Sequence, residues 1–446
     1  GRRELFKDLY IDKTDWKWEK YPIIHFEFND LTTTSVEGFE NDLADHLQDR
    51  LSEAGYCYDP SKPPHWNFGK AIETLAVQKD GNGNDVHRGV VILIDEYDAP
   101  VGHCLDDVAK AEAVRERLSV VYSQMKNRTG DIRFLFMTGV SKFTKLSVFS
   151  ALNNLTDLTM DRPEFAGMLG YTRREIETTL APQLGAFAKK LRCTREAAMK
   201  RLLAWYDSYR FSPYSNVKVL NPVSVGQALP SGILTDYWSK TGVPTLVVER
   251  LQAGGKMPEE LAEVRTTPGN LDVCDATDLP WIPLLYQSGY LTIKGVEWTD
   301  NHEGRYVSGL TLGIPNMEVR ENLKSNFWRT IMHMEASSFD ALVDVAKKQL
   351  AEGDVDALMN ETLFSLYAAL PSTWRVKDES DAKRYFQLFM KMLGADVRAE
   401  QVSARGDADA IIETKKAVYV FEFKFNKGAK SAIRQIREKG YADAYK

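Results

Sequence analysis

The chain has 446 residues, a formal net charge of −6, and residues that are 43% hydrophobic and 27% charged. This is the composition of an ordinary soluble globular protein, and the length predicts two or three domains. No run of about 18 apolar residues and no signal-peptide pattern occurs, which excludes a membrane-spanning protein and a membrane partner. The four cysteines and seven histidines are scattered without metal-ligand spacing, so we expect free thiols in a reducing, cytoplasmic setting and no zinc.

The charge is unevenly distributed along the chain. Residues 371–446 contain 16 Lys and Arg against 11 Asp and Glu, a balance of +5, so the preceding residues carry −11. A basic C-terminal part on an acidic body indicates a polyanionic partner for that part.

The first third of the chain alternates strand and helix patterns. In chain order these are a strand at 23–28, a helix at 36–54, a loop at 59–70, a helix at about 70–78, a strand at 90–94, a helix at 106–126 and a strand at 133–137. The order predicts an α/β fold with a doubly wound parallel sheet. The continuous apolar run at 90–94 predicts a central strand that is covered on both faces.

Two carboxylates, Asp95 and Glu96, follow this apolar strand directly. Open α/β sheets bind ligands at the carboxyl ends of their strands, and in P-loop NTPases this is the Walker B position. There the first carboxylate holds Mg²⁺ and the second orients the attacking water. A strand-to-loop cap without chemistry is the alternative for this pair.

The segments LIDEYDAP (93–100) and TGVSKFTKLSVFSALNNLTDLT (138–159) together closely resemble the AAA-ATPase-like family. The resemblance implies a P-loop NTPase-like sheet. It also implies that Thr138 takes the position of the polar residue that senses the γ-phosphate. A hydroxyl that caps a turn is the alternative for Thr138. Downstream segments between residues 169 and 323 look like the helical lid and connector of the same family.

One part of the family pattern is missing. The Walker A loop, GxxxxGK[ST], does not occur in the sequence, which starts at Gly1 in what reads as the end of a helix. Without that loop the phosphates of ATP lack their cradle, so the ATPase activity of this chain is left open. Either the loop precedes Gly1 in a full-length protein that binds ATP, or the module has become a scaffold. We favour the first explanation.

A β-hairpin is predicted near the C-terminus, with strands at 409–412 and 418–425 and a turn at 413–417. Side chains alternate between the two faces of a strand, so Glu422 and Lys424 share a face that begins with apolar residues. Charged groups set among bulky aromatic residues are costly to desolvate unless they are paired or bind a metal.

We therefore predict that Asp409 and Glu422 hold a divalent cation, with Lys424 beside the bound water. A solvated Glu–Lys pair on an edge strand is the alternative. The pattern of Gly406-Asp407-Ala408-Asp409 followed by Phe421-Glu422-Phe423-Lys424 resembles the PD-(D/E)XK nuclease superfamily. The resemblance implies a small α/β/α domain and metal-dependent phosphodiester hydrolysis.

Further site residues follow from this resemblance. A third acid is common on or near the first helix of such domains, here predicted at 381–393, and the candidates are Glu379, Asp381 and Glu400. Asp407 is an extra acid that could share the metal or replace Asp409, which fits the Gly-x-Ala-Asp spacing better. Gln435 matches a recurring Gln of the family that orients a metal-bound water.

Four basic residues follow the hairpin. Lys427, Lys430, Arg434 and Arg437 have the spacing i, i+3, i+7 and i+10, which places them on one face of a helix, with Ile433 and Ile436 directed toward the sheet. Such a face suits a phosphodiester backbone, and a solvated helix face is the alternative.

The predicted organisation is an AAA-ATPase-like core at 1–166, a helical lid and connector at 167–335, and a PD-(D/E)XK nuclease-like domain at 336–446. The predicted function is a nuclease that uses Mg²⁺ or Mn²⁺, coupled to an ATP-binding module, with nucleic acid, preferably DNA, as partner. A homo-oligomer is left open. The alternative is an NTP-dependent switch or scaffold that binds nucleic acid or a protein without cleavage.

Overall fold

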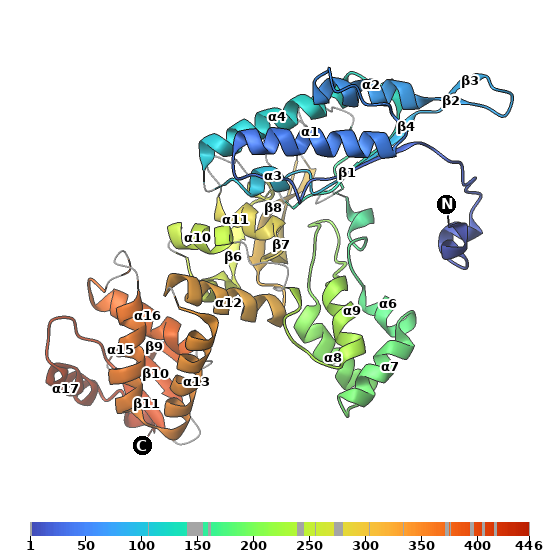
Figure 1. Ribbon diagram of the computed structural model, residues 1–446. Helices are drawn as coiled ribbons and strands as arrows, with labels where there is room; N and C mark the ends of the chain where they lie inside the picture. Colours follow the sequence, from blue (N-terminus) through green and yellow to red (C-terminus); the bar gives the residue numbers. More distant parts are fainter. Residues whose placement is uncertain are drawn as a thin grey trace. The chain divides into compact units, whose positions relative to one another are not determined.

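The structure, a computed structural model, describes residues 2–105, 107–140, 155–158, 162–238, 245–254, 256–271, 280–302, 304–332, 334–370, 374, 376–392, 397–403, 406–413 and 417–445. The chain divides into two compact units (Figure 1). The first contains Gly1–Asp157 and Gly269–Ser288, and the second contains Leu158–Pro268 and Gly289–Lys446. None of the described helices is both long enough and apolar enough to cross a bilayer.

The first unit is built on a parallel three-stranded sheet in the order β1-β4-β5. Its strands are β1 (Ile23–Glu27), β4 (Val90–Asp95) and β5 (Ile132–Met137). Its other elements are α1 (Val36–Glu53), α2 (Pro64–Ala76), the hairpin β2 (Val77–Lys79) and β3 (Asp85–His87), α3 (Ala99–Gly102), α4 (Val108–Lys126) and α11 (Trp281–Gln287). The predicted alternation of strands and helices is confirmed.

The described strands are not doubly wound. Both crossovers, β1 to β4 and β4 to β5, advance in the same direction, and right-handed crossovers of that kind place their helices on one face. Accordingly α1, α2 and α4 pack against one another (Figure 1). Burial along β4 alternates, with Ile92 and Ile94 buried but Val91 and Leu93 only half-buried. The face of β4 that carries Val91 and Leu93 is thus less completely covered by the described residues than the face that carries Ile92 and Ile94.

Helix α1 confirms the predicted apolar stripe, because Phe39, Leu43, Leu47 and Leu51 are all buried. The start of α2 was predicted too late. Pro64 is the first residue of this helix, a position where proline is tolerated because the first N–H has no partner inside the helix.

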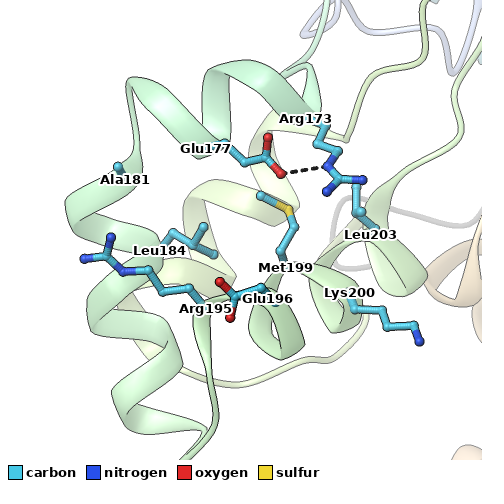
Figure 2. Close-up of a pocket in the computed structure, with 9 residues that line it drawn as sticks. All are labelled: Arg173, Glu177, Ala181, Leu184, Arg195, Glu196, Met199, Lys200 and Leu203. Atoms are coloured by element: carbon cyan, nitrogen blue, oxygen red, sulfur yellow. Dashed lines mark hydrogen bonds and ion pairs between the residues drawn. The ribbon is translucent and has the colours of Figure 1, made fainter.

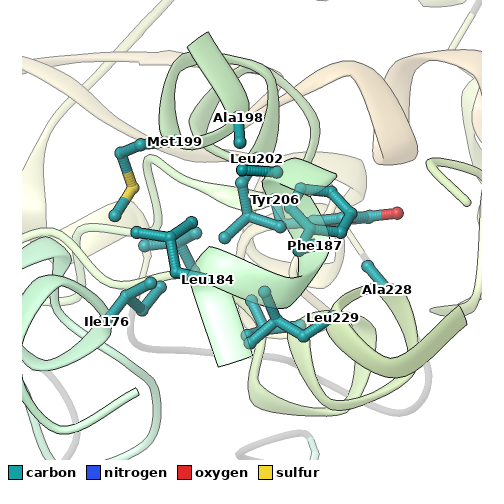
Figure 3. Packing of buried hydrophobic residues seen from close by; sticks show 12 residues of the cluster. Ile176, Leu184, Phe187, Ala198, Met199, Leu202, Tyr206, Ala228 and Leu229 are labelled. Carbon is teal, nitrogen blue, oxygen red and sulfur yellow. The ribbon is translucent and has the colours of Figure 1, made fainter. Parts of the chain in front are cut away.

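The helical part of the second unit contains α6 (Arg173–Thr178), α7 (Ala181–Lys190), α8 (Arg195–Tyr206), α9 (Pro222–Ser231) and α10 (Thr245–Ala253). The four helices α6, α7, α8 and α9 share one apolar core (Figure 3). Phe187 of α7, Leu202 and Tyr206 of α8, and Ala228 of α9 are fully buried in this core. Burying these side chains is the main force that holds the short helices together.

An antiparallel sheet in the order β6-β8-β7 and the helix α12 form the connector. Their bounds are β6 (Val264–Thr266), β7 (Thr292–Asn301), β8 (Gly304–Gly313) and α12 (Met317–Ile331). Glu318 of α12 is fully buried and accepts hydrogen bonds from Ser224 Oγ at 2.8 Å, Tyr237 N at 2.9 Å and Trp238 N at 3.0 Å. One carboxylate thus ties α12 to α9 and to the segment before α10.

The C-terminal part has a second antiparallel sheet, in the order β11-β10-β9. Its elements are α13 (Ala336–Glu352), α14 (Val355–Ala357), a π-helical segment (Leu358–Leu363), α15 (Phe364–Ala369), α16 (Glu379–Met392), β9 (Val397–Ser403), β10 (Gly406–Glu413), β11 (Val418–Phe421) and α17 (Ala429–Lys439). The Phe386 ring of α16 lies 4.6 Å from the Phe421 ring, whereas Ile436 of α17 and Val420 both pack against the buried cluster that contains Ile411. Since Val420 and Phe421 are neighbours on one strand, they point to opposite faces, and the predicted α/β/α arrangement is confirmed.

Two details of this sheet differ from the predictions. The strand β9 was not predicted, and β11 ends at Phe421 instead of continuing to residue 425. The reason for the early end is a side-chain acceptor. The Phe423 N–H donates to Asp409 Oδ2 at 2.8 Å rather than to a backbone carbonyl of β10, so the ladder stops there.

Candidate functional site

The hairpin of β10 and β11 brings Asp409 and Glu422 to the same place. Ala410 pairs with Phe421, and continuing this antiparallel register by one residue sets Asp409 opposite Glu422. The Glu422 side chain is only 2% exposed. Asp409 is half-buried, and its main-chain carbonyl accepts a hydrogen bond from Gln387 Nε2 at 3.1 Å.

Lys424 lies between two carboxylates. Its Nζ is 2.8 Å from Glu422 Oε1 and 3.0 Å from Glu379 Oε1, with the side chain 15% exposed. Burial alone would lower the pKa of Lys424, but the hydrogen bonds to Glu422 and Glu379 outweigh it, and the pKa is raised. Lys424 is therefore a fixed positive charge at neutral pH.

The second carboxylate oxygen of Glu422, Oε2, is buried and has no hydrogen-bond partner among the described residues. A buried carboxylate oxygen that no donor satisfies is destabilising, and a cation is the natural complement. Asp409 Oδ1 and Glu422 Oε2 are hard carboxylate oxygens, the type of ligand that Mg²⁺ prefers.

No group of three or more His, Cys, Asp or Glu able to hold a metal occurs in the part of the chain that the structure describes. Mg²⁺ does not require such a group, since it is usually held by one or two carboxylates together with waters and substrate phosphates. The donor set of Asp409 and Glu422 therefore fits this ion.

The structure distinguishes between the candidates for a third acidic residue at the site. Glu379 is joined to Glu422 through Lys424. The carboxylate of Asp381 instead accepts the Lys377 N–H at 3.0 Å, at the start of α16. Glu400 and Asp407 lie in β9 and β10, and their side chains fall outside what the structure describes.

Two residues of α16 at this site were missed from the sequence. Lys383 Nζ is 3.5 Å from Asp409 Oδ1, and Gln387 contacts the carbonyl of the same residue. The sequence did contain a signal for these two residues, because Glu379, Lys383 and Gln387 are spaced four residues apart and therefore share one face of the helix. Only the docking of α16 on β10 shows that this face meets Asp409.

Gln435 lies on α17, and its Nε2 donates to the Tyr441 hydroxyl at 3.4 Å. Among the described residues it has no hydrogen bond with Asp409, Glu422 or Lys424. The predicted role of Gln435 at the metal-bound water therefore stays a prediction.

The four predicted nucleic-acid-binding residues are all exposed. Lys430, Arg434 and Arg437 lie on α17 with the spacing i, i+4 and i+7, so they share a face. Lys427 is not on the helix but in the turn that precedes it, which corrects the prediction. Ile433 is 49% exposed rather than buried against the sheet.

A second set of predicted residues lies in the first unit, at the carboxyl ends of β4 and β5. Asp95 is the last residue of β4, Thr138 follows β5, and Thr138 Oγ1 donates a hydrogen bond to Asp95 Oδ1. The backbone fixes this contact, since Thr138 N donates to Ile94 O and Tyr97 N donates to Thr138 O. The sheet thus brings two predicted site residues, 43 positions apart, into contact.

Glu96, the third predicted residue here, has a positive φ of 54°. This left-handed conformation is unfavourable for a residue with a Cβ, and such strain is concentrated at functional sites. Burial and the neighbouring Asp95 raise the pKa of the Glu96 carboxyl. A raised pKa suits a group that accepts a proton from an attacking water.

A separate pocket of about 470 Å³ opens among α6, α7 and α8 (Figure 2). Apolar residues such as Leu184 and Met199 line it together with Lys200 and with Arg173, whose Nε lies 2.7 Å from Glu177 Oε1. No predicted site residue lines this pocket.

Comparison with known proteins gives matches to the two segments that contain these residues. Residues 1–149 match the family described as "Predicted AAA-ATPase", and residues 377–446 match the "PD-(D/E)XK nuclease superfamily". A protein of Azotobacter chroococcum mcd 1, named "Uncharacterized protein in vnfD 5'region", is 28% identical over 455 residues, which span 100% of this chain and 82% of that protein. No solved structure matches the chain significantly. The chain is therefore similar to the predicted AAA-ATPase family over residues 1–149 and to the PD-(D/E)XK nuclease superfamily over residues 377–446.

Proposed function

We propose that the C-terminal domain hydrolyses phosphodiester bonds in nucleic acid, with DNA as the preferred substrate. In this proposal Asp409 and Glu422 hold Mg²⁺ or Mn²⁺. The observation that supports it best is the buried Glu422 Oε2 without a hydrogen-bond donor among the described residues, beside a lysine that already satisfies the other oxygen. The match of residues 377–446 to the nuclease superfamily supports the same chemistry.

The bound metal would polarise the scissile phosphate and lower the pKa of a water molecule. Lys424 would stabilise the negative charge that develops on the phosphate, since its raised pKa keeps the ammonium charged. Asp409 is oriented for this task by the Phe423 N–H, which holds Oδ2 and leaves Oδ1 for a cation. Gln435 is proposed to orient the water on the strength of the family resemblance alone.

The phosphodiester backbone of the substrate would contact Lys427 and the basic face of α17. This face, formed by Lys430, Arg434 and Arg437, is exposed. Lys and Arg attract phosphates irrespective of base sequence, so the contact would add affinity rather than sequence specificity.

The first domain is proposed to be an ATP-dependent partner of this activity. Asp95 and Glu96 would be its Walker B pair and Thr138 its γ-phosphate sensor, with ATP as the bound nucleotide. The hydrogen bond between Thr138 and Asp95 supports a shared site. We further propose the boundaries 1–166, 167–335 and 336–446 for the core, the lid with its connector, and the nuclease-like domain.

The test is cleavage of labelled DNA by the purified chain with Mg²⁺ or Mn²⁺ and with EDTA. We expect metal-dependent cleavage, and Lys424→Ala should reduce the rate by about 100-fold or more, because an electrostatic stabiliser of the transition state is removed. Lys348→Ala removes an exposed lysine of α13 and should leave the rate unchanged. Cleavage by Lys424→Ala at the wild-type rate would refute the assignment. DNA binding without metal binding or cleavage would favour a switch or scaffold.

A further inference from the structure

A second ammonium group, that of Lys383, faces the proposed metal site. It extends from α16, and its Nζ lies 3.5 Å from Asp409 Oδ1. Both side chains are largely covered, with Lys383 22% and Asp409 24% exposed. Lys383 thus lies near Asp409 Oδ1 in a place that is largely shielded from water.

That oxygen is the one that a cation would need. Asp409 Oδ2 already accepts the Phe423 N–H at 2.8 Å, so Oδ1 is the oxygen that remains for a ligand. The distance of 3.5 Å from Lys383 is longer than the 2.7–2.9 Å typical of a charge-assisted hydrogen bond. Lys383 therefore attracts Asp409 mainly through charge and does not lock it.

The charges around the site are largely compensated without a metal. Lys424 pairs with both Glu422 and Glu379, and Lys383 pairs with Asp409. A divalent cation between Asp409 and Glu422 would bring two positive charges close to the Lys383 ammonium. Like charges at such a distance repel strongly in a partly buried site, so metal and lysine cannot share Asp409 equally.

We propose that Lys383 is a positioning residue that competes with the divalent cation for Asp409 Oδ1. Its ammonium compensates the charge of the carboxylate before the metal binds, and the metal displaces it. The displaced ammonium then faces the anionic phosphodiester group of the substrate that binds at the metal. This inference rests on the proposed nuclease site, and it adds a residue that sets the metal affinity of that site.

The competition predicts the sign of a metal-binding measurement. In Lys383→Met the side chain keeps its length and loses its charge, so Mn²⁺ should bind more tightly, by about fivefold or more, in isothermal titration calorimetry of the full chain. A lysine that only stabilised the fold would give the opposite result, since its removal would loosen Asp409 and weaken binding. Lys383→Arg keeps the positive charge and should leave the dissociation constant within about twofold of wild type.

Two further variants keep the test decisive. Lys383→Gln replaces Lys383→Met if that variant does not fold, as judged by circular dichroism. Lys348→Met removes one exposed positive charge from α13 and corrects for the change in net charge. An unchanged or weaker Mn²⁺ affinity in the neutral Lys383 variants would overturn the inference and leave the nuclease proposal intact. Absence of Mn²⁺ binding by the wild type would overturn both.

Discussion

Lys424 Nζ lies 3.0 Å from Glu379 Oε1, although 45 positions separate the two residues in the chain. The contact joins the segment after β11 to the first turn of α16. Together with the 2.8 Å contact to Glu422, it fixes the ammonium in one position. A lysine held in this way is preorganised, which is what electrostatic stabilisation of a transition state requires.

Removing either proposed metal ligand should weaken metal binding. We expect Asp409→Asn and Glu422→Gln each to lower Mn²⁺ affinity by about tenfold or more in calorimetry, because each replaces a charged oxygen ligand by a neutral amide. Glu438→Gln changes an exposed carboxylate of α17 and serves as the control. Wild-type affinity in both ligand variants would contradict the site.

Neutralising the basic face of α17 should change the salt dependence of DNA binding. The test uses one triple variant, which carries Lys430→Gln, Arg434→Gln and Arg437→Gln together. In this variant the slope of log K for DNA binding against log salt concentration should become shallower by about 0.9 for each phosphate that is no longer neutralised. Fluorescence anisotropy with a labelled duplex in EDTA measures this without cleavage. The matched control neutralises Lys17, Lys20 and Lys126, which are exposed in the first unit. Equal slopes in both variants would show that α17 is only a solvated face.

The buried Glu318 should make stability depend on pH. Burial is the main cause of its raised pKa, so the folded protein binds this proton more tightly than the unfolded chain does. The stabilisation from the proton is fully present below the ordinary glutamate pKa of 4.5 and is lost as the pH rises through the raised value. Glu318→Gln cannot titrate, so wild type should lose stability relative to this variant over that range. Urea unfolding of both proteins at several pH values measures the difference, and a constant difference would contradict the prediction.

Replacing Glu318 by an apolar residue should be more damaging. Glu318→Leu leaves the N–H groups of Tyr237 and Trp238 without their acceptor, which should reduce the free energy of unfolding by about 3 kcal/mol. Glu321→Leu, at an exposed position of the same helix, should change it by about 0.5 kcal/mol or less. Similar losses of stability in both variants would indicate an effect of helix propensity or solubility instead.

Gly139 should not tolerate a side chain. A Cβ on this residue would clash with the Asp98 carboxylate and lie 2.6 Å from the Tyr97 ring, just beyond the contact between Thr138 and Asp95. We expect Gly139→Ala to destabilise the first unit by about 2 kcal/mol in thermal or urea unfolding. Gly130→Ala is the control, because a Cβ there meets nothing within 4 Å. Equal stability of the two variants would mean that the loop after β5 adjusts freely.

The sequence by itself determined the features that depend on neighbours along the chain. Apolar runs predicted β1, β4 and β5, helical spacing predicted α1, and the adjacency of Asp95 and Glu96 to β4 set them at the end of that strand. The Glu-x-Lys spacing likewise put Glu422 and Lys424 near each other. Such features follow from the repeat of the helix or strand, which local residues decide.

Only the tertiary structure decided which surfaces meet. The side on which α1, α2 and α4 cover the sheet depends on the direction of the crossovers, and β11 ends early because a carboxylate on another strand takes the N–H of Phe423. The approach of Lys383 to Asp409 and the burial of Glu422 Oε2 depend on how α16 packs against β10. Contacts between segments far apart in the chain are set by packing free energy, which a local pattern of residues does not contain.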